Sequence, residues 1–402
     1  MNKLLPATLL SILFSTTTPA LADIVTVNCT AFAPGSVSAA LAASTGPTTL
    51  VLSGTCNDSV SIDRDDITIT GDAVITGFFP QDRITIDGAQ RAVLSGVTIE
   101  SGIMGVHATN NASFSMTNVT LTKNVHGLIV DNGAAVTLNN DNWIKGNFVF
   151  GFQALNGAKM HVTKASGVAG TTHIANNFLG GQVSVNSSLF VTDGAKVDVH
   201  NNHSIGLSIN TGSTGMLFNS DLHTFDNALD GLDVVSNSNF EVDGESEVIS
   251  ERNGRDGISI DNGAINLFGF FSSASGEPRI QANNNAGNGV NVESTSKLDI
   301  GRNASIQAND NKAAGVKLDD GSSAILQRAD INNNVGKLDM SGNGDSRFES
   351  GEAKTGDVVL SFGSRISFNT EPDNAGVVTP NNVGTALCDR SSLSRGDVRC
   401  VD

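Results

Sequence analysis

Three residues that can exchange protons recur at one fixed interval in this chain. His173, Asp198 and His223 are each separated by 25 residues. An imidazole changes its charge near neutral pH and can act as a general acid or base, and a neighbouring carboxylate raises its basicity. If the chain repeats with this period, the three side chains form one outward-facing column. We interpret that column as a candidate catalytic site, by proton transfer or by holding a divalent metal.

The same column also has a purely structural interpretation. A row of polar side chains on the outer face of a sheet can hydrogen-bond to one another and keep that face in water. Four of the seven histidines nevertheless lie between residues 173 and 223, namely His173, His200, His203 and His223. This concentration is why the catalytic hypothesis is retained beside the structural one.

A second set of residues is acidic. Asp261, Glu293 and Asp319 each follow a recurring glycine by four positions. Stacked carboxylates repel one another unless a cation neutralises them, and calcium prefers carboxylate oxygens. The pattern therefore suggests calcium, the one cofactor for which the sequence gives a reason, with these three residues as metal ligands. The alternative is that each carboxylate starts a turn and caps backbone N–H groups.

Both columns depend on a repeated phrase in which Asn stands four residues before Gly. Looser copies of it centre on Gly105 and Gly127, and the intervals between successive glycines run from 21 to 32 residues. A period of this size predicts a solenoid, in which residues at equal offsets stack on one another. The copies are Asn147–Gly151, Asn177–Gly181, Asn202–Gly206, Asn227–Gly231, Asn253–Gly257, Asn285–Gly289, Asn311–Gly315 and Asn332–Gly336.

Within each repeat, short runs alternate apolar and polar residues. Examples are Val197–Val199, Leu207–Ile209 and Val290–Val292, and turn pairs such as Asn-Gly and Asp-Gly stand between such runs. Period two with β-branched residues predicts strands. About 25 residues hold three short strands and three turns. We therefore expect an all-β fold, a single-stranded right-handed parallel β-helix with one coil per repeat.

The repeated residues have expected roles in such a coil. Stacking would place the asparagines ~4.8 Å apart, where each amide can bond the next. We expect each Asn to take the left-handed conformation of a sharp corner, and each Gly to open the next strand where a side chain would crowd it. Phenylalanines are expected in the stacked core: Phe148, Phe150, Phe152, Phe178, Phe190, Phe218, Phe225, Phe240, Phe268 and Phe270.

The two ends of the chain differ from the repeats. Residues 1–22 have the basic, apolar and small-residue regions of a signal peptide, so we expect a secreted protein, extracellular or periplasmic, with no membrane span. Residues 23–48 should form an N-terminal cap with a short helix over residues 36–43, before strands begin at residue 49. The β-helix should cover residues 49–370, and residues 371–402 form a C-terminal tail.

The four cysteines fit an exported protein. Cys29 and Cys56 lie near one end, and Cys388 and Cys400 lie near the other. Because the ends of a solenoid are far apart, two local disulfides are favoured, each closing one end. A metal site is the alternative, although the spacing contains no C-x-x-C pair.

Composition restricts the partners. The net charge is −17, from 24 basic and 41 acidic residues, which argues against nucleic acid and anionic membranes as partners. It also disfavours an acidic glycan unless a cation or a local basic patch intervenes. Tyr is absent and Trp143 is the only Trp. A conventional aromatic sugar-binding surface is therefore not expected.

The signal peptide, capping helix, short-strand coils and recurring Asn together resemble the pectate-lyase-like superfamily, over most of residues 45–370. The resemblance is architectural, because neither the polygalacturonase motifs nor the pectate-lyase arginine pattern is present. That superfamily includes lyases, epimerases, tailspikes and adhesins. In its lyases, calcium bridges an acidic sugar to the protein and a basic side chain abstracts a proton. By this resemblance Lys317 would be the catalytic base.

Two functions follow from the sequence. The first is a secreted protein that binds or processes an extracellular polysaccharide in a lyase-like or epimerase-like way. The second is a non-catalytic extracellular scaffold, such as an adhesin or a surface-structure component, whose partner would lie on the cell surface. Fold analogy alone does not choose between them, and the sequence leaves both the enzymatic status and the oligomeric state open.

Overall fold

The structure, a computed structural model, describes most of the chain between residues 22 and 334. The described residues are 22–29, 34–164, 170–268, 277–301, 304–319, 322–326, 329–331 and 334, together with the backbone of four strands between 345 and 368. Residues 1–21 of the expected signal peptide, Phe270, Cys388, Cys400 and the tail 371–402 lie outside the described part. Predictions that rest on them remain predictions.

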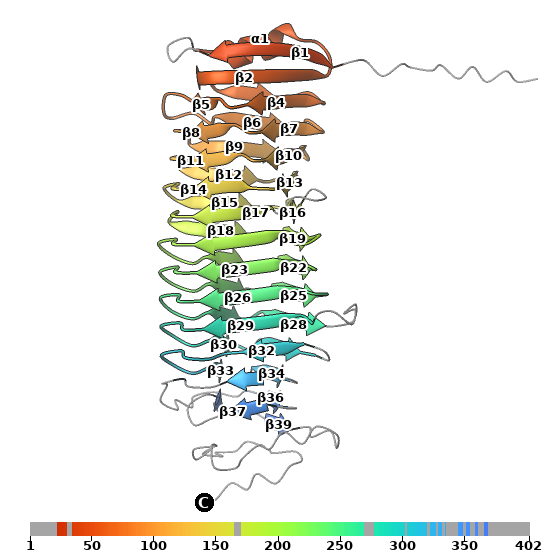
Figure 1. Ribbon diagram of the computed structural model, residues 1–402. Coiled ribbons are helices and arrows are strands. Elements are labelled where there is room, and N and C mark those ends of the chain that lie inside the picture. The colour runs from red at the N-terminus through yellow and green to blue at the C-terminus, as the bar shows by residue number, and fades with distance from the viewer. Residues whose placement is uncertain are drawn as a thin grey trace, which may run out of the picture.

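The chain is a parallel β-helix (Figure 1), as the repeat predicts. Each coil contributes one short strand to each of three sheets, called A, B and C, and every strand pairing among the described residues is parallel. Successive coils stack along one axis, from the N-terminal strands at one end to the last strands at the other (Figure 1). Residues about 25 positions apart in sequence therefore become neighbours at equivalent positions of adjacent coils.

The strands have the following bounds. Sheet A contains β1 (Asp23–Cys29), the first part of β2 (Thr48–Asn57), β4 (Ile67–Gly71), β7 (Ala92–Ser95), β10 (Ser113–Thr117), β13 (Ala135–Asn139), β16 (Lys159–Thr163), β19 (Ser188–Thr192), β22 (Thr214–Phe218), β25 (Asn239–Asp243), β28 (Ala264–Phe268), β31 (Lys297–Ile300), β34 (Ser323–Leu326), β36 (Asp345–Phe348) and β39 (Ile366–Phe368). Sheet B contains the end of β2, β5 (Val74–Thr76), β8 (Thr98–Glu100), β11 (Thr120–Thr122), β14 (Asn142–Lys145), β17 (Thr171–Ala175), β20 (Lys196–His200), β23 (Asp221–Phe225), β26 (Glu247–Glu251), β29 (Arg279–Asn283), β32 (Ser305–Gln307), β35 (Ala329–Ile331) and β37 (Gly351–Ala353). Sheet C contains β3 (Val60–Ile62), β6 (Ile84–Asp87), β9 (Met104–Thr109), β12 (His126–Val130), β15 (Phe150–Ala154), β18 (Leu179–Val183), β21 (Leu207–Ile209), β24 (Leu232–Val235), β27 (Ile258–Asp261), β30 (Val290–Glu293), β33 (Val316–Leu318) and β38 (Val358–Leu360).

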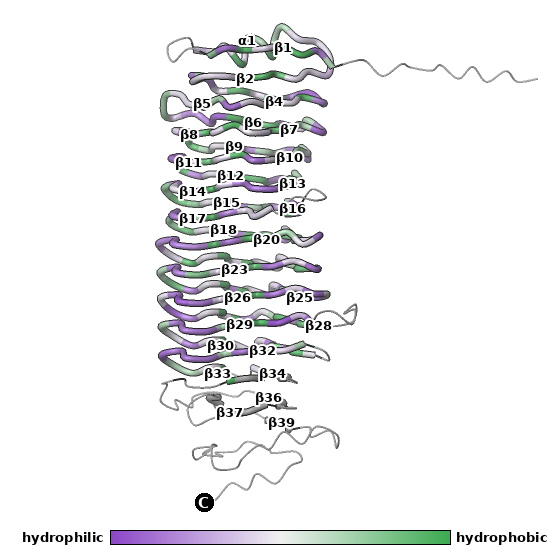
Figure 2. Tube along the Cα trace, in the orientation of Figure 1, coloured by the Kyte–Doolittle hydropathy of each residue, from purple (hydrophilic) through white to green (hydrophobic). Residues whose placement is uncertain are grey.

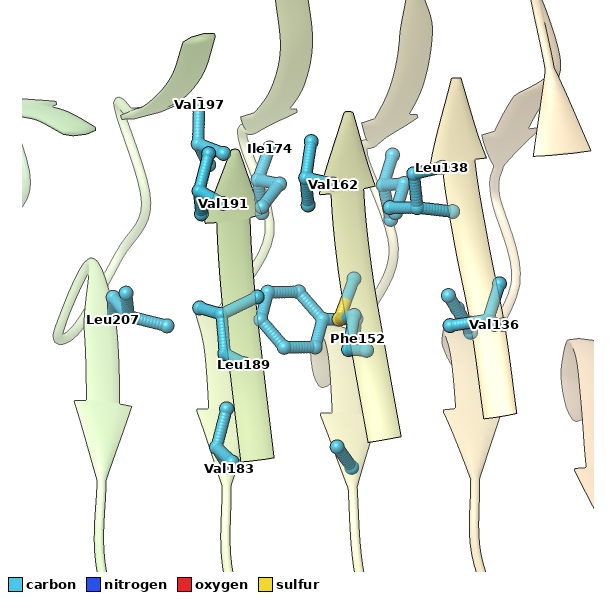
Figure 3. Close-up of a cluster of buried hydrophobic side chains, with 14 of the residues drawn as sticks. Val136, Leu138, Phe152, Val162, Ile174, Val183, Leu189, Val191, Val197 and Leu207 are labelled. Carbon is cyan, nitrogen blue, oxygen red and sulfur yellow. The ribbon is translucent and has the colours of Figure 1, made fainter. Parts of the chain in front are cut away.

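The core is the interior of the coil, filled by every second residue of each strand. Hydrophilic and hydrophobic residues alternate along the tube (Figure 2), as expected for strands with one buried face. The close-up shows Val136, Phe152, Val162 and Leu189 among the side chains that fill the interior (Figure 3). Phe152 is accommodated because the residue paired with it in the next coil is Gly181, which has no side chain.

A row of buried asparagines joins the turns between sheets B and C. In each step the amide nitrogen of one Asn donates to the side-chain oxygen of the Asn in the next coil, as from Asn177 to Asn202 at 3.2 Å and from Asn202 to Asn227 at 2.9 Å. Each Asn also donates to a strand carbonyl of the preceding coil, so its polar atoms are satisfied inside the turn. The row consists of Asn124, Asn147, Asn177, Asn202, Asn227, Asn253, Asn285, Asn311 and Asn334.

Three details of this row differ from the sequence prediction. The left-handed backbone belongs to the residue before each Asn, such as Asn176, Asn201 or Asp226, because the amide must point inward while its neighbour turns the corner. The last member is Asn334, where the pattern suggested Asn332. In the repeat that begins at Asn177, the glycine packed against the next buried asparagine is Gly180, where the pattern suggested Gly181. A Cβ on Gly180 would lie 2.8 Å from the amide nitrogen of Asn202, so only glycine fits there.

The N-terminal end is closed by a helix and a disulfide. Helix α1 (Ser36–Ala43) has the bounds expected from the sequence, and buries Val37 and Leu41. Its first turn is capped by a side chain of the coil below, since Asp58 Oδ2 accepts from the backbone N–H groups of Val37 and Ser38 at 2.7 and 2.9 Å. A strand precedes this helix, however: β1 pairs with β2, so strands do not begin only at residue 49.

The predicted Cys29–Cys56 disulfide is present, with the two Cα atoms 4.8 Å apart. It joins the end of β1 to the end of β2, at the first coil. Its partner prediction, Cys388–Cys400, lies outside the described residues. No helix in the described part of the chain is long and apolar enough to cross a membrane.

Candidate functional site

His173, Asp198 and His223 lie in one column on sheet B, in the predicted register. His173 of β17 pairs with Asp198 of β20, and Asp198 pairs with His223 of β23. Trp143 precedes the column in β14, and Ile249 follows it in β26. The residues on either side along each strand are buried, so the three side chains project outward. We call His173, Asp198 and His223 the histidine column.

The Asp198 carboxylate is the centre of this column. His173 Nδ1 lies 3.7 Å from Asp198 Oδ2, and His223 Nδ1 lies 3.8 Å from Oδ1. Lys196 Nζ lies 3.1 Å from the same Oδ1, and His223 Nε2 lies 3.4 Å from Glu251 Oε1. Within the described structure His173 Nδ1 is buried and makes no hydrogen bond. The column is therefore a chain of proton-exchanging groups in which His173 Nδ1 faces Asp198 from beyond hydrogen-bond distance.

The histidines of this surface are held in their neutral form. Burial lowers the pKa of His173, His200 and His223 below the ordinary value of 6.5, and this effect outweighs the attraction of Asp198, which acts in the opposite direction. The side chains of His173, Asp198 and His223 are only 22%, 14% and 18% exposed. Imidazoles that stay neutral near pH 7 can accept a proton, which is what a general base requires.

Aromatic rings lie before the column and in the neighbouring row of sheet B. The ring of Trp143 stacks on that of His173 with centroids 3.9 Å apart, and Lys145 Nζ lies 4.6 Å from the Trp143 ring. His200 stacks on Phe225 at 4.7 Å. These contacts fix the orientation of the rings. Glu251 was not predicted from the sequence, although it stands two residues before the buried Asn253, as His200 stands two residues before Asn202.

The acidic column on sheet C has a different environment from the one expected for a metal site. Asp261 pairs with Glu293, as the register predicts. Lys317 Nζ lies 3.1 Å from Glu293 Oε1 and 3.4 Å from Asp319 Oδ2. A lysine therefore occupies the position where a cation would bind two of the three carboxylates. In the described part of the chain, no group of three or more His, Cys, Asp or Glu side chains is arranged to hold a metal ion.

The ion pairs of Lys317 also bear on its expected role as a base. Burial disfavours its ammonium, but the hydrogen bond to Glu293 and the attraction of Glu293 and Asp319 exceed that effect, so the pKa of Lys317 is raised. A lysine with a raised pKa is protonated at neutral pH. It can attract a substrate anion, but it is a poor proton acceptor.

A charged cluster on sheet C was missed by the sequence prediction. It comprises Asp230, Asp233, Arg255 and Asp256, and we call it the sheet C cluster. Arg255 Nε donates to Asp230 Oδ1 at 2.6 Å, while Asp233 faces Ser208. Burial, helped by repulsion from Asp230, raises the pKa of Asp233 to about 6. Asp233 follows the repeated glycine by two positions, and this offset marks the outward residue of sheet C.

A second histidine group, which lies on sheet C, was also not predicted from the sequence. His107 in β9 has its Nδ1 3.7 Å from Asp82 Oδ2 and its Nε2 3.5 Å from Asp131 Oδ1. His126, in the next strand of sheet C, stacks on Phe150 with centroids 5.5 Å apart. His107 and His126 belong to the looser repeats centred on Gly105 and Gly127. The irregular pattern there did not predict these side-chain contacts.

The prediction that the phenylalanines form the core holds for only two of those whose side chains the structure describes, Phe152 and Phe240. Phe148 is 72% exposed, Phe178 55% and Phe190 37%, and Phe150, Phe218 and Phe225 are half-buried. Phe148 and Phe178 directly follow buried asparagines in the turns between sheets B and C, where a side chain points outward. Alternation within strands does not extend into a turn, so periodicity gave no guide there. These exposed rings matter because Trp and Tyr are almost lacking in the sequence.

Comparison with known proteins places the fold. No protein-family model and no curated protein matches the chain. Among solved structures, it is similar to the A-module of the mannuronan C-5 epimerase AlgE6 of Azotobacter vinelandii, at 13% identity and a TM-score of 0.51, over 83% of this chain and 93% of the module. The likeness shows a shared parallel β-helix fold.

Two further structures align less closely. The periplasmic alginate epimerase AlgG matches at 13% identity and a TM-score of 0.46, over 81% of this chain and 78% of that one. Pectate lyase Pel9A matches at 14% identity and a TM-score of 0.32, over 92% and 84% of the two chains.

Proposed function

We propose that the protein processes an extracellular polysaccharide by proton transfer at the histidine column. The observation that carries the proposal is the arrangement of two neutral imidazoles beside one carboxylate, on the outer face of a rigid sheet. The fold shared with a mannuronan C-5 epimerase module supports polysaccharide as the substrate class. Lyase and epimerase reactions both begin with removal of the C5 proton of a uronate. A neutral histidine can accept that proton in either reaction.

The residues of the column suit the steps of such a reaction. His173 or His223 takes the C5 proton, and Lys196 offers the cation that stabilises the substrate carboxylate as charge develops on it. In a lyase the C5–H electrons form a C4–C5 double bond, the C4–O bond breaks, and a protonated group of the site returns a proton to the leaving oxygen. In an epimerase the C4–O bond stays intact, and a protonated group on the opposite face of C5 delivers a proton to that carbon while the base keeps the one it removed.

Calcium is not part of this proposal. The geometry around Asp261, Glu293 and Asp319 does not favour the ion, since Lys317 already neutralises two of the three carboxylates. The predicted role of Lys317 as the base is likewise replaced by a role for the histidines. Export by the segment 1–22 is kept in the proposal, because an extracellular polysaccharide requires it.

One observation favours the alternative of a non-catalytic scaffold. The rings of Trp143 and His173 stack closely and His223 bonds Glu251, so much of the column is satisfied by its own neighbours. In that case the column would only stabilise the outer face of sheet B. Substituting its residues would then lower the free energy of unfolding.

The proposal is tested by incubating the protein with polymannuronate, polygalacturonate and neutral glycans. Unsaturated sugar ends report a lyase, inverted C5 centres seen by NMR report an epimerase, and new reducing ends alone report a hydrolase. The H173A/H223A double variant should lose activity by about 100-fold or more, as expected for a lost general base. His203→Ala, an exposed histidine outside the column, is the matched control and should keep full activity.

The pH dependence provides a second test. A base must be neutral to accept a proton, and the pKa values of His173 and His223 are lowered from 6.5. Activity should therefore be on its plateau at neutral pH and fall only at pH values below 6.5. Absence of activity on every glycan, or a double variant that loses its fold rather than its activity, would favour the scaffold.

A further inference from the structure

Phe148 and Phe178 form a pair of exposed rings that nothing in the fold requires. They occupy the same place in adjacent coils, because each directly follows a buried asparagine and Asn147 donates to Asn177 at 3.0 Å. The rings are 72% and 55% exposed. We call Phe148 and Phe178 the aromatic ridge.

The turn does not need aromatic residues for its own stability. The equivalent position after the buried asparagine is His203, Ala228, Gly254, Ala286 and Lys312 in later coils. Glycine and alanine are thus compatible with the same turn. Exposed phenylalanine contributes little to folding and costs solubility, so two of them side by side indicate a binding surface.

The position of the ridge connects it with the histidine column. Phe148 lies five residues after Trp143, and Phe178 lies five residues after His173, on the same two coils. The turns that carry the ridge directly follow β14 and β17, which lie in adjacent coils of the stack (Figure 1). The ridge therefore lies at the corner of the coil next to the strands that carry Trp143 and His173.

The residues that follow the ridge on sheet C are uncharged. Phe150 pairs with Leu179, and further along the same strands the amides of Gln153 and Gln182 hydrogen-bond to each other at 2.7 Å. Val149 and Leu179 adjoin the rings in sequence and are half-buried. The ridge therefore offers two ring faces beside amides, with no charge of its own among these residues.

The size of the ridge separates its possible occupants. One fully exposed aromatic side chain offers about 150–250 Å², so the pair, at 72% and 55% exposure, offers roughly 200–300 Å². A stable protein interface needs about 800 Å² per partner, so the ridge is too small to hold a second copy of this chain. Sugar rings have a smaller footprint, and the C–H groups on one face of a pyranose are attracted by the negative face of an aromatic ring.

We infer that the aromatic ridge is a subsite that stacks on pyranose rings of the polysaccharide and holds the chain next to the histidine column. The inference rests on the proposed function for its ligand class. The inference adds that the polysaccharide is bound by ring stacking and not by ion pairs. Stacking needs no positive charge on the protein, whose net charge is −17. The ridge touches sugars remote from the bond that reacts.

The experiment measures binding separately from turnover. Polymannuronate, polygalacturonate and neutral mannan are titrated against the H173A/H223A protein, which cannot consume them, with and without F148A/F178A. The ridge variant should weaken binding of whichever probe binds by about tenfold or more. The ratio should be equal at low and high salt, because no ion pair is lost. F148W/F178W should restore binding, whereas F148L/F178L should not.

Phe190→Ala, which removes a partly exposed ring from sheet A, is the matched control and should leave binding unchanged. Equal affinity with and without the ridge, or full rescue by leucine, would overturn the inference while leaving the proposed catalysis intact. Ridge-dependent binding without any turnover would instead reject the catalysis and keep the ridge. The inference would also be overturned if the protein bound none of the three probes. A lower mass of F148A/F178A by light scattering would overturn it too, because the ridge would then hold a second copy of the chain.

Discussion

Asp233 and the histidines of sheet B respond to burial in opposite directions. Burial disfavours whichever form is charged, so it raises the pKa of Asp233 to about 6 and lowers those of His173 and His223. Burial therefore favours the neutral form of both kinds of group. The Asp233 carboxyl becomes protonated in mildly acidic solution, while the imidazoles of His173 and His223 stay neutral at neutral pH.

The raised pKa of Asp233 predicts how stability changes with pH. Its pKa in the unfolded chain is near 3.8 and in the fold about 6. The folded state therefore binds the proton more strongly, so this contribution to stability is present below pH 3.8 and is lost as pH rises through 6. Asp233→Asn, which mimics the protonated form, should be more stable than the wild type at pH 7.5, by on the order of 1–3 kcal/mol.

The measurement is chemical denaturation at pH 4 and pH 7.5. The two proteins should be nearly equal at the lower pH. Asp72→Asn, at an exposed carboxylate, is the control and should change neither value. A variant that is less stable than the wild type at pH 7.5 would mean that the charge of Asp233 is stabilised by its neighbours, contrary to the expected direction.

At the scale of the element, the turn between sheets B and C combines two adjacent residues with separate tasks. Asn176 takes the left-handed backbone that turns the corner, and Asn177 points inward and bonds Asn147, Ile144 and Asn202. Removing an inward amide leaves several buried polar groups without partners, which costs more than the bonds themselves are worth.

Asn177→Ala should therefore lower the free energy of unfolding by roughly 3 kcal/mol or more. Asn176→Gly changes the neighbouring asparagine but keeps the left-handed conformation, and should alter stability by about 0.5 kcal/mol or less. Urea titration followed by circular dichroism compares the two. Equal effects of the two substitutions would show that the amide row contributes nothing beyond the turn itself.

At the scale of the whole molecule, each coil contacts mainly the coils above and below it. Stability in such a solenoid is a sum over neighbours, so the ends are the weakest places. Helix α1, β1 and the Cys29–Cys56 disulfide protect the N-terminal end, where the crosslink spans 27 residues of sequence. The disulfide lowers the entropy of the unfolded chain at that end.

The C29A/C56A variant should consequently lose about 2–4 kcal/mol of stability. Hydrogen exchange should show the loss concentrated in β1, α1 and β2, with little change from β20 onward. The double substitution isolates this crosslink from Cys388 and Cys400, which a reducing agent would also affect. A uniform loss of protection along the chain would contradict the nearest-neighbour account.

The sequence by itself determined the coil, the three-strand repeat, the register of His173, Asp198 and His223 and the pairing of Cys29 with Cys56. The first three follow from local periodicity, because a parallel β-helix places equal offsets of a repeat side by side, and the cysteine pairing follows from the distance between the two ends of a solenoid. The tertiary structure decided what periodicity does not encode. The exposure of Phe148 and Phe178, the ion pairs of Lys317 and the pKa of Asp233 depend on which side chains meet across coils and on the path of each turn. Those contacts involve distances between side chains, which no single repeat specifies.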